Sequence, residues 1–178
     1  MRKIVYYVAA SLDGFIAGPD EDISGFIQGG EGVEQYQADL QHYDAVLMGR
    51  KTYEFGYRYG LEPGQPAYGH MTHYIFSNSL RFDVAHEQVK VSPLDLDFIR
   101  DLKRRDGKAI YLCGGGELAG RLLEQGLIDE IKIKLNPLVL GRGVPLFANL
   151  KRQYNLEFVQ SVSFPSGMQT LTYTVKSL

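Results

Sequence analysis

The chain has 178 residues, and its 19 Lys and Arg against 21 Asp and Glu give a formal net charge of -2. This balance excludes a field-driven affinity for nucleic acid or for an anionic membrane surface. A hydrophobic fraction of 44% with 22% charged residues is typical of a globular chain, and we expect residues 1–178 to form a single domain. The single cysteine, Cys113, excludes an internal disulfide framework and favours a reducing, cytoplasmic setting.

The first predicted element is a strand over residues 4–10, a continuous apolar run of the kind found in strands covered on both faces. The run is too short to span a membrane and lacks a clear cleavage site, so we expect neither a membrane anchor nor a signal peptide here. Apolar side chains then recur at helical spacing over residues 31–43, which predicts a helix. Short buried strands are predicted over residues 44–48, 72–76 and 109–113.

Two more helices are predicted in the second half of the chain. Ser92 is the expected N-cap of the first, with Pro93 in its first turn and an end at residues 106–107. The other helix follows the glycines after Cys113 and reaches Gly126.

The last third of the chain alternates at the period of a strand. Apolar residues over 131–135 alternate with Lys132 and Lys134, so we expect one face in the core and the lysines toward water. Residues 170–175 also alternate, after a turn at 164–168. The chain therefore favours an α/β fold with a mostly parallel central sheet, helices on both faces and a C-terminal antiparallel hairpin.

The strongest ligand-binding signal is the run Gly114-Gly115-Gly116, which lies between a buried strand and a helix. Backbone without side chains can approach a phosphate closely, and the helix N-terminus attracts the negative charge. A glycine-rich tight turn without a ligand explains the same run.

Three further strand ends carry polar candidates. Gly49 is followed by Arg50, Lys51 and Thr52, whose donors suit a phosphate, although a solvated Arg-Lys pair beside a helix start is an equal alternative. Ser77 and Asn78 follow another strand and suit a ribose phosphate or a simple turn. Asp13 follows the first strand, where ligands bind in open α/β sheets, but it also suits an Asx turn with Gly14.

Other chemistries lack their residue patterns. No serine lies in a nucleophile elbow, and no glycine-rich loop carries a Walker lysine. The four histidines show no paired spacing with a carboxylate, so we expect no metal site. Hydrolase and kinase interpretations are disfavoured.

Four motifs in this order resemble the dihydrofolate reductase-like fold, and within it the bacterial branch similar to the reductase domain of riboflavin biosynthesis. They are residues 11–17 (SLDGFIA), 48–53 (MGRKTY), 114–118 (GGGEL) and the run from 126–130 (GLIDE) to Phe147. The resemblance covers nearly the whole chain and implies a three-layer fold.

The resemblance implies NADPH binding along the carboxyl edge of the sheet and hydride transfer to a small heterocycle. It implies that the nicotinamide meets Ala9 and Ile16, and that the phosphates meet Gly49, Arg50, Lys51 and Thr52, helped by Ser77 and Asn78. It implies that the diphosphate and ribose are wrapped by Gly114, Gly115, Gly116, Glu117 and Leu118. It also implies a cis peptide bond between Gly114 and Gly115.

The substrate half departs from authentic dihydrofolate reductase. The chain has no tryptophan, and the position where that enzyme places a pterin-binding carboxylate falls near Val33. Glu31, Glu34 and Asp39 lie nearby on the same predicted helix, where exposed carboxylates are the usual case. Glu117 would repel a nearby phosphate, so a preference for NADPH rests on Arg50, Lys51 and Ser77.

We therefore expect a cytoplasmic NADPH-dependent reductase of a pyrimidine- or pteridine-like heterocycle, with Asp13 as the candidate catalytic residue for a substrate contact or proton relay. Tyr53, Tyr57 and Tyr59 either line the pocket or pack a helix on the sheet. The alternative is a non-catalytic NADP(H)-binding sensor or assembly domain. The C-terminal strands and the resemblance also suggest a homodimer.

Overall fold

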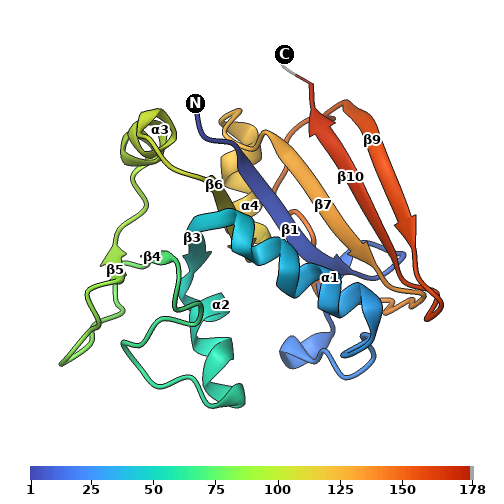
Figure 1. The fold of residues 1–178 in the computed structure, drawn as a ribbon, viewed down its shortest axis with the longest axis horizontal. Coiled ribbons are helices and arrows are strands. Elements are labelled where there is room, and N and C mark those ends of the chain that lie inside the picture. Colours follow the sequence, from blue (N-terminus) through green and yellow to red (C-terminus); the bar gives the residue numbers. More distant parts are fainter. Residues whose placement is uncertain (177–178) are drawn as a thin grey trace.

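The computed structural model describes residues 1–176 and is built on an eight-stranded sheet (Figure 1). In spatial order the strands are β5 (Val89–Ser92), β4 (Thr72–Phe76), β3 (Tyr43–Gly49), β6 (Ala109–Gly114), β1 (Ile4–Ala10), β7 (Glu130–Leu135), β10 (Gln169–Val175) and β9 (Leu156–Ser163). A small separate sheet pairs β2 (Phe15–Ala17) with β8 (Val144–Pro145). The helices are α1 (Glu31–Asp39), α2 (Arg50–Phe55), α3 (Leu96–Arg104) and α4 (Gly116–Glu124), and short 3-10 turns cover Pro19–Glu21, Leu40–His42 and Gly56–Tyr59.

The sheet is parallel from β5 to β7, and β10 and β9 add an antiparallel hairpin at one edge. The mostly parallel sheet and the C-terminal hairpin predicted from the sequence are both confirmed. β1 lies in the middle, where Tyr6 is opposite Leu112 of β6 on one side and Ile131 of β7 on the other. The continuous apolar run of β1 is explained because both of its edges and both of its faces are covered.

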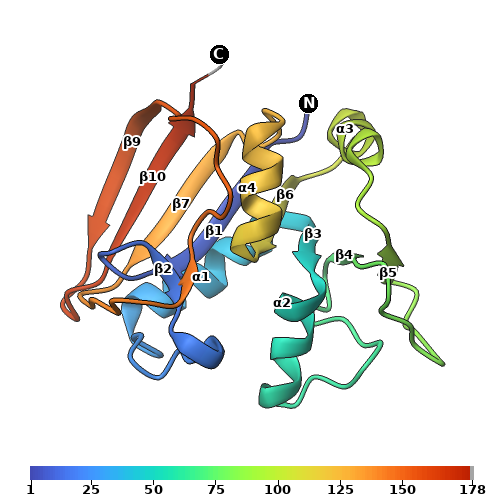
Figure 2. The same cartoon turned by 180° about the vertical axis from the view of Figure 1, so that it is seen from behind.

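Helices cover both faces of the sheet, as predicted (Figures 1 and 2). On one face, Ile99 of α3 and Leu122 of α4 belong to a buried cluster with Ile4 and Tyr6. On the opposite face, Tyr53 of α2 packs in a second cluster with other aromatic side chains from the sheet. The first cluster is mainly aliphatic, whereas the second is rich in tyrosine and continues to the carboxyl ends of the strands.

The predicted start of α3 is wrong. Ser92 is the last residue of β5, where it lies opposite Phe76 and its carbonyl oxygen accepts a hydrogen bond from Ser77 N. Asp95 is the N-cap instead, because its carboxylate accepts hydrogen bonds from the amides of Asp97 and Phe98 at 2.9 and 3.1 Å. Pairing with β4 therefore takes precedence over the local Ser-Pro signal.

The helix predicted over residues 31–43 is shorter than expected. α1 ends at Asp39, a 3-10 turn covers Leu40–His42, and Tyr43 already belongs to β3. Tyr43 is buried against the sheet, so its apolar side chain fits a buried strand as well as a helix.

The prediction that Lys132 and Lys134 face water is also wrong. α1 crosses this face of β1 and β7 (Figure 1), and the Lys132 side chain is only 16% exposed, in an ion pair with Asp39 of α1. Alternation in a sequence separates the two faces of a strand but does not show which face is open. Among residues 1–176, no helix is both long and apolar enough to cross a bilayer.

Candidate functional site

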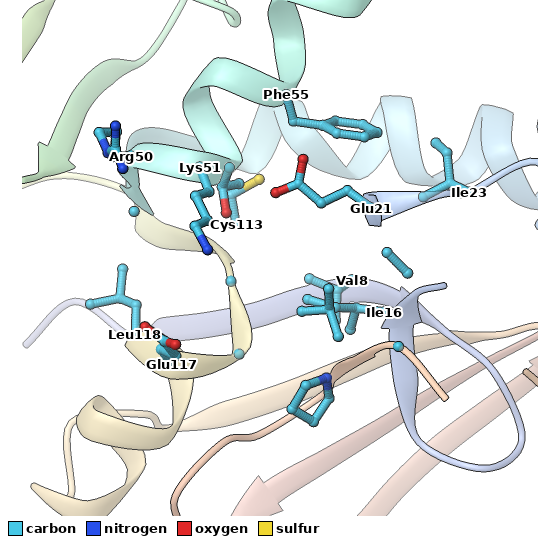
Figure 3. Close-up of a pocket in the computed structure, with 18 of the residues that line it drawn as sticks. Val8, Ile16, Glu21, Ile23, Arg50, Lys51, Phe55, Cys113, Glu117 and Leu118 are labelled. Carbon is cyan, nitrogen blue, oxygen red and sulfur yellow. The ribbon is translucent and has the colours of Figure 1, made fainter. Parts of the chain in front are cut away.

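A cavity of about 1350 Å³ opens at the carboxyl ends of the central strands (Figure 3). Segments far apart in the chain meet here, including the ends of β1, β3, β4 and β6, the residues after β2, the start of α4 and the loop before β8. Ligands of open parallel sheets bind at this edge, because the loops that follow parallel strands gather there. Most of the predicted cofactor residues line it, namely Ala9, Ile16, Gly49, Arg50, Lys51, Thr52, Ser77, Asn78, Gly115, Gly116, Glu117 and Leu118.

The glycine turn between β6 and α4 forms one wall of the cavity, and its three glycines differ in backbone conformation and in surroundings. The peptide bond between Gly114 and Gly115 is cis, as the resemblance implies, and Gly114 has a φ of +110°. Gly114 itself does not line the cavity, unlike its two neighbours. A Cβ on Gly116 would lie 2.1 Å from the carbonyl oxygen of Pro145, so this glycine lets the turn pack against β8. Gly115 is the open position, with Thr52 Oγ1 3.5 Å from the place of a Cβ.

Positive side chains gather around the end of the cavity formed by the glycine turn. In Figure 3, Lys51 lies between Arg50 on one side and Glu117 and Leu118 on the other. Arg50 Nη1 lies 3.7 Å from Glu54 Oε1, in an exposed pair that has little stabilising effect. Lys51 has no hydrogen-bond or ion-pair partner among the described residues.

Two further arginines at this cavity were missed by the sequence analysis. Arg121 of α4 and Arg142 of the loop before β8 both line it, and neither has an ion-pair partner in residues 1–176. Arg121 lies four residues after Glu117, and this helical spacing could have indicated that the two side chains share one side of the helix. Arg142 had no local signal, because only the fold brings its loop to the cavity. Both add positive charge to a lining that also holds the acidic Glu117.

The other end of the cavity is more apolar. Figure 3 shows Val8 and Ile16 facing Phe55 and Ile23 across the open space, with the Glu21 carboxylate beside the Phe55 ring. Glu21 Oε2 lies 3.3 Å from Arg58 Nη2, so its charge is partly balanced at the mouth of the cavity. A flat ring is well suited to this end, because apolar walls bury its faces.

Polar side chains line the cavity beneath α1. The hydroxyls of Tyr36 and Tyr111 lie 2.7 Å apart, and Lys134 Nζ lies 3.4 Å from the centroid of the Tyr36 ring. Burial lowers the pKa of Lys134 to about 8, opposed by the nearby Cys113. Burial also raises the pKa of the Cys113 thiol, which therefore stays neutral, and raises the pKa of Tyr36 to about 12. Lys134 and the neutral groups around it, Tyr36, Tyr111 and Cys113, were not predicted as site residues.

No carboxylate of α1 lines the cavity. Asp39 is turned toward Lys132, and it accepts hydrogen bonds from Tyr7 Oη and Gln35 Nε2 at 3.1 and 2.9 Å. Glu31 and Glu34 also lie outside the lining. The side of the cavity beneath α1 therefore lacks the pterin-type carboxylate, as the position of Val33 suggested.

Asp13, the predicted catalytic residue, lies outside the cavity lining. Its carboxylate accepts hydrogen bonds from Ser11 Oγ at 2.6 Å and from the amides of Leu140 and Gly141 at 3.1 and 2.7 Å. These bonds, with that from Ser11 the largest cause, hold the pKa of Asp13 below its usual value. In this structure Asp13 ties the loop after β1 to the loop after β7, and its catalytic role stays a prediction.

Ser77 and Asn78 lie at the end of β4 and line the cavity beside Ser79. Ser77 Oγ accepts hydrogen bonds from Ser79 N and Leu80 N at 3.2 and 3.0 Å, which is the turn that the sequence also allowed. The hydroxyl hydrogen of Ser77 is still available to a ligand. Tyr53 is buried against the sheet and donates a hydrogen bond to the carbonyl of Gln65, so it packs the helix and does not line the cavity.

The structure is an α/β fold with a cavity of about 1350 Å³ at the carboxyl edge of its sheet, and comparison with known proteins gives its family and a reductase-like fold. Residues 2–170 match the model of the RibD C-terminal domain, and the chain belongs to this family. It is 34% identical over 169 residues to uncharacterized protein YwjB of Bacillus subtilis (strain 168), covering 94% of this chain and 95% of that protein.

Solved structures agree with this assignment. A putative riboflavin biosynthesis protein from Shewanella sp. PV-4 is 26% identical, with a TM-score of 0.83 over 99% of this chain and all of that one. Dihydrofolate reductase from Enterococcus faecalis, complexed with NADP(H), has a TM-score of 0.67 at 14% identity, covering 98% of this chain and 97% of that one. The predicted dihydrofolate reductase-like fold is confirmed, and family and fold support an oxidoreductase class.

Proposed function

We propose that the protein is an NADPH-dependent reductase that transfers a hydride to a small pyrimidine- or pteridine-like heterocycle. The observation that carries this proposal is the continuity of the cavity. It runs from a glycine turn with four cations in the surrounding lining, of which only Arg50 is in an ion pair among the described residues, to an apolar end beside β1. A dinucleotide that lies along it places phosphates among cations and a ring between apolar walls. The fold shared with a reductase described as complexed with NADP(H) supports the same cofactor.

The residues present fit this cofactor by their chemistry. Gly115 leaves room for a diphosphate beside Thr52, because a Cβ there would reach only ordinary contact with Thr52 Oγ1. Arg50 and Lys51 supply donors for phosphate oxygens, and Arg121 adds a third cation from α4. Ala9 and Ile16 would meet the nicotinamide at the apolar end. When bound, the cofactor supplies the hydride, and the protein's part is to position the two rings and exclude water.

The test is a titration of the purified protein with NADPH and NADH, followed by assays of NADPH oxidation on a panel of pterins and aminopyrimidines. We expect NADPH to bind more tightly than NADH and at least one heterocycle to be reduced. Arg50→Ala should weaken NADPH more than NADH, because the guanidinium pairs with the 2′-phosphate. Lys90→Ala, at an exposed position outside the cavity, is the matched control. Equal losses for both cofactors contradict the role of Arg50.

The alternative, a non-catalytic NADP(H)-binding sensor or assembly domain, is not favoured. The cavity extends beyond the phosphate end to a ring-sized apolar end with polar groups beneath α1, which a sensor of the nucleotide alone does not need. Tight NADPH binding without turnover of any heterocycle would reverse this preference.

We also propose that the protein is a cytoplasmic homodimer that pairs through β9. All eight residues of this edge strand are exposed, and they include Phe158 at 59%, Val159 at 51% and Val162 at 43%. An apolar edge strand left open to water promotes association. Val159→Lys should convert the dimer to a monomer in sedimentation equilibrium, while Val84→Lys, an exposed valine elsewhere, should leave it intact. A wild-type protein that sediments as a monomer contradicts the proposal.

A further inference from the structure

The Asp13 carboxylate holds the backbone of a loop that is distant in the chain. It accepts hydrogen bonds from the amides of Leu140 and Gly141 at 3.1 and 2.7 Å. The hydroxyl of Ser11, a buried residue, donates to the same carboxylate at 2.6 Å and so fixes the orientation of the acid. The loop after β1 therefore sets the course of the loop after β7.

Arg142 follows directly after this tie and lies between two glycines. Gly141 and Gly143 have positive φ values of +75° and +151°. Glycine permits many backbone conformations, so a residue between two glycines has a fixed direction only where other groups hold the chain. Asp13 holds it on the Gly141 side. On the other side, a Cβ at Gly143 would overlap the carbonyl oxygen of Ala17, so this backbone packs closely on the end of β2.

The side chain presented in this way is a cation without a partner in the protein. Arg142 lines the cavity, and its guanidinium makes no ion pair or hydrogen bond among residues 1–176. An arginine that meets only solvent gains nothing from a fixed backbone. A guanidinium aimed at an anion does gain from it, because its hydrogen bonds are directional. The restraints on both sides of Arg142 therefore favour a binding role.

The start of α4 identifies the group that Arg142 meets. The carbonyl oxygen of Pro145 packs against Gly116, the last glycine of the turn. Three residues of chain span at most about 11 Å, so Arg142 starts within that distance of Pro145. Ala148 N donates a hydrogen bond to the Gly116 carbonyl at 3.0 Å, which holds the segment after β8 on the same turn. Arg142 thus belongs to the end of the cavity where the proposed cofactor places its diphosphate.

We propose that Asp13 is a positioning residue whose carboxylate fixes the loop that presents Arg142, and that Arg142 donates hydrogen bonds to the diphosphate of the bound dinucleotide. This inference rests on the proposed reductase function and adds a cation and its support to the cofactor site. Asp13 itself touches no ligand in this arrangement. Its loss acts on the affinity for the cofactor, while turnover at saturating NADPH stays close to that of the wild type.

The sign of the effect separates positioning from a simple effect of charge. Asp13 and the cofactor are both anionic, so removal of the Asp13 charge alone should tighten the binding of NADPH. Loss of the loop tie should instead weaken it, because Arg142 is then no longer held toward the diphosphate. Asp22→Ala is the matched control, since this exposed carboxylate accepts hydrogen bonds from Ser24 and does not line the cavity. It should leave the affinity for NADPH unchanged or slightly higher.

The test is a double-mutant cycle on the affinity for NADPH, measured by titration calorimetry at pH 7. Arg142→Gln should weaken NADPH about tenfold, the size expected for a hydrogen bond to a charged group. Asp13→Ala should weaken it about threefold or more in the wild-type background, and by less than about twofold once Arg142 is replaced. Thermal unfolding reports a merely structural role, because the loss of stability in Asp13→Ala should be the same in both backgrounds.

Two additions make the cycle independent of one variant and of the nucleotide. Asp13→Asn keeps one oxygen acceptor, and it replaces Asp13→Ala in the cycle if circular dichroism shows that the alanine variant is not folded. Inorganic diphosphate, titrated into the wild type and Arg142→Gln, reports on Arg142 without a nucleotide. We expect weaker binding of diphosphate to Arg142→Gln.

The outcomes for the two proposals can be distinguished. Where the wild type binds NADPH, the inference is overturned by an unchanged or higher affinity in Asp13→Ala, by additive losses in the cycle, or by an unchanged affinity in Arg142→Gln. Failure of the wild type to bind NADPH overturns the proposed function. The diphosphate titrations then still test Arg142, and equal affinities for the wild type and Arg142→Gln, or no binding to either, overturn the inference as well.

Discussion

The hydroxyl oxygens of Tyr36 and Tyr111 lie 2.7 Å apart and join α1 to β6 beneath the cavity. The two rings also contact each other, with centroids 6.4 Å apart. Tyr111 is almost completely buried, so its hydroxyl depends on partners inside the protein. This pair therefore fixes the distance between the first helix and the strand that leads to the glycine turn.

A double-mutant cycle on this pair should reveal strong coupling. Tyr36→Phe or Tyr111→Phe alone removes one hydroxyl and leaves the other poorly satisfied, and each should lower the free energy of unfolding by about 1–2 kcal/mol. The double variant should lose less than the sum, because the hydrogen bond between the two hydroxyls is lost only once. Urea denaturation of the four proteins measures the coupling, and strictly additive losses would show that the hydroxyls do not depend on each other.

Gly116 should tolerate no side chain. In Gly116→Ala the new methyl group would lie 2.1 Å from the Pro145 carbonyl oxygen, which belongs to the backbone and cannot rotate away. We expect a loss of about 1–3 kcal/mol or more, as for other overpacked sites. Gly69→Ala is the matched control, since nothing lies within 4 Å of its Cβ position. Equal midpoints of thermal unfolding for the two variants would contradict the close packing of the turn on β8.

Local patterns predicted the fold well where a single strand or turn carried the signal. The strand at 4–10 and the glycine turn were found because a continuous apolar run and a cluster of glycines are each compatible with few kinds of local structure. The prediction for Ser92 was wrong because a serine before a proline fits both a helix N-cap and the last residue of an edge strand. The structure differs from the sequence-based prediction where strand pairing between distant segments overrides a local preference.

Most of the lining residues that the sequence predicted belong to the end formed by the glycine turn, and Ala9 and Ile16 were the predicted residues of the apolar end. Residues 49–52 and 114–118 lie next to their strands, so the chain itself places them at the sheet edge. Lys134 was expected to face water, because nothing in residues 131–135 shows that α1 covers them. Arg142 reaches the cavity only through the long loop after β7. The groups that line the cavity beneath α1 come from separate segments, and their meeting is a property of the tertiary fold.

The lowered pKa of Lys134 gives a pH-dependent stability. Its pKa is about 8 in the folded protein against 10.5 for the free side chain, so between these values the unfolded chain binds more protons. Stability should therefore rise with pH across this window, and burying the charge costs on the order of 3 kcal/mol at pH 7 as an upper figure. Lys134→Met should be more stable than the wild type at pH 7 by roughly 1–3 kcal/mol.

The difference between these two proteins should shrink as the pH rises from about 8 toward 10. Buried tyrosines act in the opposite direction above pH 10, since burial raises the pKa of Tyr36 to about 12, but they are common to both proteins and cancel. Urea denaturation at pH 7, 8, 9 and 10 measures the difference. A gap that does not change with pH would show that Lys134 keeps an ordinary pKa.

Asp13→Asn distinguishes a loop tie from a catalytic group. The carboxylate accepts three hydrogen bonds, and an amide retains only part of this acceptor capacity. We expect lower thermal stability and faster proteolysis near residues 138–141, with turnover per folded molecule changed less than threefold. A loss of turnover of a hundredfold or more at unchanged stability would instead support the catalytic role predicted from the sequence.

The central place of β1 has a consequence for synthesis of the chain. Ile4 pairs with Ile110 and Tyr6 with Ile131, so β1 is translated long before both of its neighbours in the sheet. A nascent chain exposes two open edges of an apolar strand throughout that interval. Synthesis from the amino end therefore leaves the sheet without its centre until β6 and β7 have both been made.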